Sequence, residues 1–164
     1  MREDSKEKMN MNSNIKYQGS TPNGEVRRGL PRGIRNNNPL NIRCSSGQTW
    51  LGECPEQGDR LFVQFSSMKW GIRAALIIMR TYWKKGYRTS GQIIHRWAPP
   101  TENNTDAYVK NVCTMTGLQP CQPLEENDYS KLVSAMSLIE TGRRIPAEEI
   151  ENVKQLFNIK ITAQ

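Results

Sequence analysis

The sequence predicts an α+β domain that is mainly helical. Four or five segments place apolar residues at helical spacing between capping and stopping residues, whereas the stretch LFVQF has the composition of a strand. Because the chain has 164 residues, it has room for one compact domain and a tail but not for two ordinary domains. We therefore expect a polar tail over residues 1–28 and one domain over residues 29–164.

The tail and the charge exclude several classes of protein. Residues 1–28 are nearly without large apolar groups, so we expect them to be flexible, and they lack the apolar stretch of a secretory signal. The longest strongly apolar run, Ala74 to Met79, is too short to cross a bilayer, so we expect no membrane span. With 23 Lys and Arg against 16 Asp and Glu, the net charge of +7 suits an anionic polymer as a partner.

The first part of the domain is expected to be irregular. The stretch PRGIRNNNPLNIR scatters apolar residues among Pro, Gly and Asn, which is typical of an ordered loop. Its Asn36, Asn37 and Asn38 are equipped to hold backbone bends or to bind a polar ligand, and composition favours the bends. Strand signals follow at Thr49 to Leu51 and at Leu61 to Phe65, and we expect them to pair as a small hairpin.

The helices occupy the rest of the domain. Ser66 or Ser67 is expected to cap a central helix that runs to about Lys85 and ends at Gly86. A short helix over Thr89 to Trp97 is stopped by two prolines. Three more helices are expected: DAYVKNVCTMT, capped by Thr105 and ended by Gly117; YSKLVSAMSLIE, opened by Asp128 and ended by Thr141 and Gly142; and AEEIENVKQLF, with Pro146 in its first turn.

The cysteines leave two interpretations open. Cys44, Cys54, Cys113 and Cys121 are an even number, but none forms the closely spaced pair that a zinc site usually needs. Proximity in the chain favours disulfides between Cys44 and Cys54 and between Cys113 and Cys121, while four reduced thiols are the alternative.

Glu140 is the first candidate for chemistry. The sequence has no glycine-rich phosphate loop, no HExxH and no GxSxG motif, which removes most support for nucleotide hydrolysis and for serine catalysis. In SLIETGRR, Glu140 lies at the edge of an apolar helix face, where partial burial raises the pKa of a carboxyl group as a general acid requires. The alternative is an ion pair with Arg143 or Arg144.

Glu53 is the second candidate, because it follows Trp50 in a turn. An aromatic ring close to a carboxylate is suited to stacking a sugar and binding its hydroxyl groups. The alternative is an exposed turn glutamate. Glu102, in a polar loop, ranks below both carboxylates, and His95 is expected to be a packed histidine.

Four blocks in order carry a resemblance to a known family. RGIRNNNPLNIR, TWLGE, FVQFSSMKWGIRA and IIHRWAPPTENNTDAYVKNV resemble the small lysozyme-like domain of phage virion-associated and prophage proteins that act on peptidoglycan, over roughly residues 32–145. The same order is loosely similar to glucosaminidases of the autolysin and flagellar type. The corresponding residues here are Asn37, Asn38, Asn41, Ile42, Trp50, Gly52, Glu53, Phe62, Phe65, Thr105, Asp106 and Tyr108.

One departure from those glucosaminidases shapes the expected mechanism. Their essential glutamate ends a helix, in a Glu-Ser-Gly block, before the Asn loop, whereas here the similar Glu140, Thr141 and Gly142 follow everything else. The block order therefore implies a circularly permuted lysozyme-like domain. The resemblance implies that Glu140 protonates the glycosidic oxygen, that Glu53 activates water or stabilises the sugar cation, and that the Asn loop (Asn37, Asn38) and Tyr108 orient the sugar.

In a lytic transglycosylase, by contrast, Glu140 would act alone as acid and then as base, and Glu53 would only bind. Trp50 is expected to border the groove and stack a sugar, while Trp97 is expected to be packing. Action on the cell wall implies work outside the cytoplasm, in the periplasm, secreted or on a virion, where both disulfides are expected to form.

The implied partner is bacterial peptidoglycan, with virion proteins or a cognate immunity protein as further candidates, and no cofactor or metal is expected. A rival interpretation is a virion or secretion-apparatus component that uses a lysozyme-like fold only to bind glycan or a partner. A nucleic-acid-binding module is the weakest interpretation, because the arginines cluster near the tail and no helix has a basic face.

Overall fold

The computed structural model describes residues 29–163, and over this range the domain is mainly helical, as the sequence predicts. Its helices are α2 (Arg32–Arg35), α3 (Met68–Lys84), α4 (Ser90–Trp97), α5 (Thr105–Thr116), α6 (Asp128–Thr141) and α7 (Ala147–Leu156). The predicted tail over residues 1–28 lies outside the described residues.

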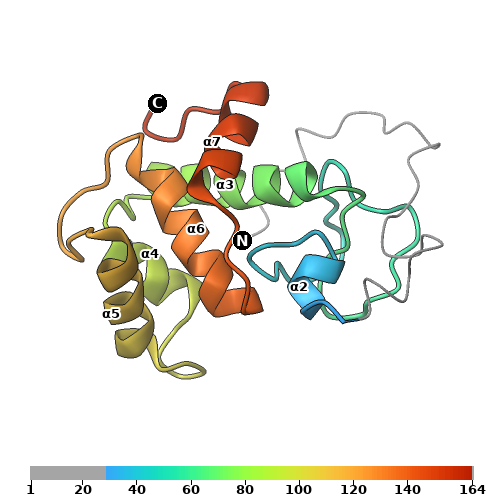
Figure 1. The fold of residues 1–164 in the computed structure, drawn as a ribbon, viewed down its shortest axis with the longest axis horizontal. Coiled ribbons are helices and arrows are strands. Elements are labelled where there is room, and N and C mark those ends of the chain that lie inside the picture. Colours follow the sequence, from blue (N-terminus) through green and yellow to red (C-terminus); the bar gives the residue numbers. More distant parts are fainter. Residues whose placement is uncertain (1–28, 164) are drawn as a thin grey trace.

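The longest helix is α3, and a continuous stretch of it is buried in the domain. Its residues from Gly71 to Met79 are all buried, and both α6 and α7 pack against it. Figure 1 shows α6 crossing α3, with α4 and α5 on one side of α6 and the loop-rich segment that carries α2 on the other. The carboxyl end of α6 therefore lies where the two halves of the domain meet.

The helix ends follow the capping residues in the sequence. Thr89 and Gln92 form the capping box that starts α4. Gly117 and Gly142 end α5 and α6 in the left-handed conformation, with φ of 75° and 79°. The cap of α5 is Asn104 rather than the predicted Thr105, whose hydroxyl donates instead to Ala98 O at 2.5 Å.

The predicted hairpin forms only in part, without regular strands. Glu53 pairs with Phe65 in an isolated antiparallel bridge, and Arg43 pairs with Phe62 in another, so the 61–65 segment pairs with two different segments. Side-chain amides add to the backbone bonds of these bridges: Asn38 Nδ2 donates to Val63 O at 2.9 Å and Asn37 Nδ2 to Phe65 O at 2.9 Å. The Asn loop therefore helps to hold this segment as extended chain.

The last part of the described chain is fixed by a partly buried ion pair. Lys154 Nζ lies 2.7 Å from Glu126 Oε2, and the same carboxylate accepts hydrogen bonds from the backbone N–H groups of Ile161 and Thr162. Burial opposes the charge of Glu126, but the hydrogen bonds from Lys154 and from these amides outweigh it and lower the pKa of Glu126 to about 2. The carboxylate therefore stays ionised and ties the end of the chain to the body of the domain.

Candidate active site

Glu140 occupies the last turn of α6, at the meeting point of the two halves of the domain. The sequence places it there because Gly142 ends the helix directly afterwards. The carboxyl end of a helix carries a partial negative charge, which disfavours a second negative charge nearby. Helix position and burial thus both favour the neutral form of this carboxyl group.

Two hydrogen-bond donors converge on one oxygen of Glu140. The Tyr108 hydroxyl, from α5, donates to Oε2 at 2.8 Å, and Trp97 Nε1, from the end of α4, donates to the same oxygen at 3.1 Å. No donor reaches Oε1 from the described part of the chain. Oε2 is therefore held as an acceptor, and Oε1 is the oxygen on which a proton can reside.

The surroundings of Glu140 favour its neutral form. Burial raises the pKa of Glu140, and the hydrogen bonds from Tyr108 and Trp97 and the positive charge of Arg43 oppose this shift without cancelling it. Burial and the neighbouring Glu140 raise the pKa of Tyr108 as well, so the phenol remains a donor. The arrangement suits a carboxylic acid that acts as a proton donor.

Glu140 opens into a polar cleft of about 340 Å³ between the two halves of the domain. The walls combine amides, aromatic rings, charged groups and prolyl backbone: Asn41, Arg43, Phe62, Arg96, Trp97, Ala98, Pro99, Glu102, Asn103 and Glu140. Aromatic faces beside hydrogen-bonding groups are what a sugar ring requires.

The Asn loop packs directly on the end of α6. Asn41 Nδ2 donates to Glu140 O at 2.8 Å, and Asn41 adopts φ of 51°, a left-handed conformation that asparagine tolerates. A Cβ built on Gly33 would lie 2.5 Å from Thr141 Cγ2, so only glycine allows α2 to approach α6 this closely. These contacts fix the backbone of Glu140 against the loop.

The structure brings Tyr108 to Glu140 but does not bring Glu53 there. The Glu53 carboxylate accepts a hydrogen bond from the Trp50 backbone N–H, and Glu53 is not among the residues that line the cleft. The other carboxylate in the cleft is Glu102, which the sequence ranked lower. Tyr108 holds the carboxyl group of Glu140 through its hydroxyl, whereas the resemblance implied that it orients the sugar.

Trp50 does not border the cleft, and two asparagines expected to bind sugar are not among the residues that line it. Trp50 is 5% exposed and belongs to the hydrophobic core, whereas Trp97 packs against the core, as expected, and also lines the cleft. Asn37 and Asn38 are 4% and 0% exposed, and their amides bind backbone groups, so they hold the loop's bends instead of a sugar. Sequence reasoning missed Trp97 because its hydrogen bond spans 43 residues of chain.

We expect substitutions of these two tryptophans to separate their roles. Trp97→Phe keeps an aromatic ring but removes the donor to Glu140, so the pKa of Glu140, followed by carbon-13 NMR titration of its carboxyl group, should rise. Unfolding free energy should fall by only about 1 kcal/mol. Trp50→Ala should leave the pKa of Glu140 in place and cost about 3 to 5 kcal/mol. An unchanged pKa of Glu140 in Trp97→Phe, measured alongside urea unfolding, would contradict the assignment.

The alternative roles considered for Glu140 and His95 are not seen. Among residues 29–163, neither Arg143 nor Arg144 forms an ion pair with Glu140, and Arg144 Nε donates instead to Ser134 Oγ at 3.0 Å. His95 is half-exposed rather than packed, with its Nε2 4.0 Å from Asp106 Oδ1.

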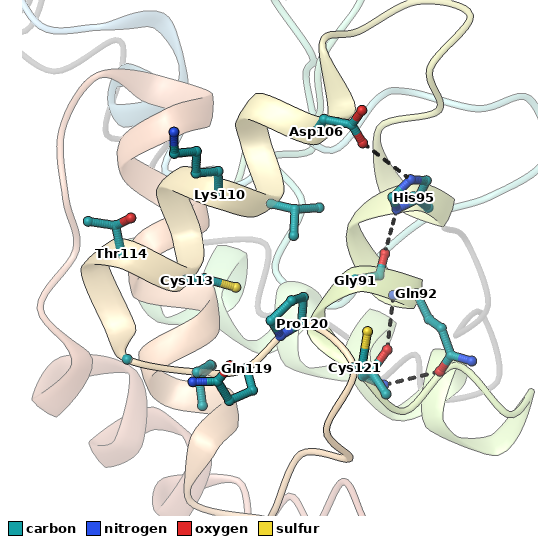
Figure 2. A pocket seen from close by; sticks show the side chains of 14 residues that line it. Gly91, Gln92, His95, Asp106, Lys110, Cys113, Thr114, Gln119, Pro120 and Cys121 are labelled. Carbon is teal, nitrogen blue, oxygen red and sulfur yellow. Dashed lines mark hydrogen bonds and ion pairs between the residues drawn. The ribbon is translucent and has the colours of Figure 1, made fainter.

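All four cysteines are free thiols in the structure, so the expected disulfides are not present. Burial, and then the charge of Glu53, raise the pKa of Cys54 to about 12, which suppresses the thiolate that disulfide exchange requires. Cys113 and Cys121 line a second, larger cavity of about 830 Å³ between α4, α5 and the segment after α5. Figure 2 shows their sulfur atoms on different sides of this cavity. Glu140 is not among the residues that line this second cavity.

The described range lacks a metal site and a membrane-spanning helix. No group of His, Cys, Asp and Glu within residues 29–163 is arranged to hold a metal ion. No helix in this range has the length and apolar character needed to cross a membrane.

The fold and the cleft define a mainly helical protein with a half-buried carboxyl group in a polar cleft. The sequence matches no family model. Protein P5 of Pseudoalteromonas phage PM2 is 43% identical over 114 residues, an alignment that covers 68% of this chain and 71% of P5. The chain therefore belongs to the family of phage protein P5.

Proposed function

We propose that this protein cleaves the glycan strands of bacterial peptidoglycan and that Glu140 is its general acid. The observation that carries the proposal is the Glu140 carboxyl group, held by Tyr108 and Trp97 through one oxygen at the wall of a polar cleft. Its raised pKa keeps it protonated beyond the ordinary range of a glutamate. General acids that protonate a glycosidic oxygen have this property.

The packing of α6 on the Asn loop supports a permuted lysozyme-like domain. The resemblance requires the Glu140 block to lie beside the Asn loop although about 100 residues of chain separate them. The bond from Asn41 to Glu140 O and the close approach of Gly33 to Thr141 meet that requirement. This contact favours the lysozyme-like interpretation over a helical fold without relation to it.

In the proposed reaction, Glu140 donates the proton on Oε1 to the bridging oxygen as the bond from the sugar carbon to that oxygen breaks. The positive charge that develops on the sugar ring then needs a nucleophile. If Glu102 activates water, the product carries a reducing end. If the Glu140 carboxylate removes a proton from a hydroxyl group of the same sugar, the ring closes on itself and the product carries an anhydro end.

The setting that we propose is a phage particle acting on the cell wall from outside the cytoplasm. Membership of a phage protein family supports that setting. The rival is a virion component that only binds glycan. The enzymatic interpretation is favoured because a half-buried carboxyl group with a raised pKa costs stability when it ionises. A site that only binds glycan gains nothing that offsets this cost.

The test is incubation of the protein with purified sacculi, followed by mass analysis of the soluble products. We expect glycan fragments with either reducing or anhydro ends, which also separates the two mechanisms. Glu102→Gln should abolish products with reducing ends but leave anhydro products unaffected. Binding to sacculi without release of fragments would support the structural rival, and fragments cut only in the peptide stems would contradict the proposed bond.

A further inference from the structure

One arginine in the Glu140 cleft has its backbone fixed but no ion-pair partner among residues 29–163. Arg43 is exposed and lines the cleft, and within this range its side chain forms no ion pair or hydrogen bond, although its charge acts on Glu140. Its backbone is anchored: it bridges Phe62, and the adjacent Ile42 is fully buried. Within the described residues, the guanidinium donors are therefore available to a ligand.

The guanidinium group of Arg43 lies over the ring of Phe62. Arg43 Cζ lies 5.3 Å from the centroid of the ring, and Arg32 Cζ lies 4.7 Å from the same centroid. Stacking on an aromatic face orients a guanidinium group while leaving its N–H groups free to donate. Both Arg43 and Phe62 belong to the wall of the cleft.

The neighbouring arginine shows what such a group binds in this protein. Arg32 is held by Asp59 through two parallel bonds of 2.7 Å each, from Nε and Nη2. Burial opposes the charge of Asp59, but the bonds from Arg32 and Asn36 and from two backbone amides hold its pKa well below the usual range. Arg32 is thus paired with a carboxylate from the same chain, whereas the described residues supply no equivalent carboxylate for Arg43.

The charge balance of the cleft favours an anionic ligand. Arg43 and Arg96 both line it and neither has an ion-pair partner in residues 29–163, while Glu102 supplies one negative charge and Glu140 is biased towards its neutral form. A neutral sugar polymer would leave the excess positive charge of the cleft without a counter-charge. Arginine binds a carboxylate through two parallel hydrogen bonds, which adds orientation to attraction.

We infer that Arg43 is a substrate-binding residue that receives a carboxylate of the glycan strand next to the bond that Glu140 cleaves. The inference rests on the proposed function, and it deepens that function by making the enzyme selective for acidic glycans over neutral strands of the same sugars. Two carboxylates of peptidoglycan have this chemistry: the lactyl group of the sugar, which is free where the peptide has been removed, and the carboxylates of the peptide stem.

The experiment measures binding by calorimetry in an E140Q background, so that the glycan is not consumed. Three ligands separate the sources: strands stripped of peptides, strands that retain them, and stripped strands whose carboxylates have been converted to amides. Arg43→Gln should weaken binding to stripped strands by about 10- to 100-fold if the lactyl carboxylate is the ligand, or binding to peptide-bearing strands if the stem is. Either result supports the inference.

Matched variants make the test specific. Arg60→Gln removes the same charge from an exposed arginine outside the cleft lining and should leave all affinities unchanged. Arg43→Lys keeps the charge but not the planar fork, so its loss should be smaller than that of Arg43→Gln.

Equal binding of all three ligands by the E140Q parent, or equal binding of every ligand by that parent and its Arg43→Gln derivative, would overturn the inference. Cleavage of sacculi by the wild-type protein would still stand in that case. Conversely, binding that depends on Arg43 without any cleavage by the wild-type protein would overturn the proposed function alone.

Discussion

Replacing Glu140 with glutamine is expected to abolish glycan cleavage and leave the fold in place. The amide has the size of the carboxyl group and can still accept the bonds from Tyr108 and Trp97, but it has no acid proton to give. Loss of a general acid commonly lowers a rate by a factor of about 100 to 10,000. The rate of fragment release from sacculi gives this factor directly.

The stability of the same variant distinguishes an acid from a structural ion pair. The folded pKa of Glu140 is raised, so its contribution to stability is present below the ordinary pKa and is lost as the pH rises through the folded value. Glutamine cannot ionise, so at neutral pH the melting temperature should be unchanged or higher. A lower melting temperature with cleavage retained would contradict the assignment. Glu56→Gln, in an exposed turn, is the control and should change neither quantity.

Asn38→Ala is expected to produce a large loss of stability. Asn38 is fully buried, its Nδ2 donates to Ile42 O at 3.0 Å and to Val63 O at 2.9 Å, and its Oδ1 accepts from Ile42 N at 2.8 Å. Alanine leaves buried backbone groups of Ile42 and Val63 without these partners. The cost should be about 3 to 5 kcal/mol in urea unfolding, since each unsatisfied buried group costs about 1 to 3 kcal/mol.

An exposed asparagine provides the comparison. Asn103 donates one bond, to Pro99 O at 3.1 Å, and Asn103→Ala should cost no more than about 1 kcal/mol. If Asn38→Ala lost as little as Asn103→Ala, the Asn loop would not be what holds the 61–65 segment.

The helices could be predicted from the sequence because their signals are local. Gly86, Gly117 and Gly142 follow the carboxyl ends of α3, α5 and α6, and α4 lies within the predicted Thr89 to Trp97 segment, as expected. Each of these signals acts within a turn or two of the helix it starts or ends. The hairpin could not be predicted in the same way, because distant asparagine side chains decide how residues 61–65 pair.

The candidate site was predicted in part. Features set by local sequence were predicted, whereas features set by contacts between distant segments were not. The edge position of Glu140 on an amphipathic helix is a local pattern, and it correctly indicated a half-buried carboxyl group. Which tryptophan lines the cleft depends on packing between α4, α5 and α6, so the sequence pattern wrongly assigned the cleft to Trp50, although Trp97 was correctly expected to pack. The nearness of Glu53 to Trp50 in the sequence reflects a turn, because the Glu53 carboxylate accepts a hydrogen bond from the Trp50 backbone N–H.

The protonation of Glu140 can be measured without any substrate. Carbon-13 labelling of the glutamate carboxyl groups, with the E140Q spectrum to assign the resonance, gives the pKa of this residue by titration. We expect the Glu140 carboxyl group to titrate above the ordinary glutamate value of 4.5, as an acid in a half-buried cleft must. Titration at or below 4.5 would show that Glu140 is an ordinary carboxylate at neutral pH and would contradict its role as the general acid.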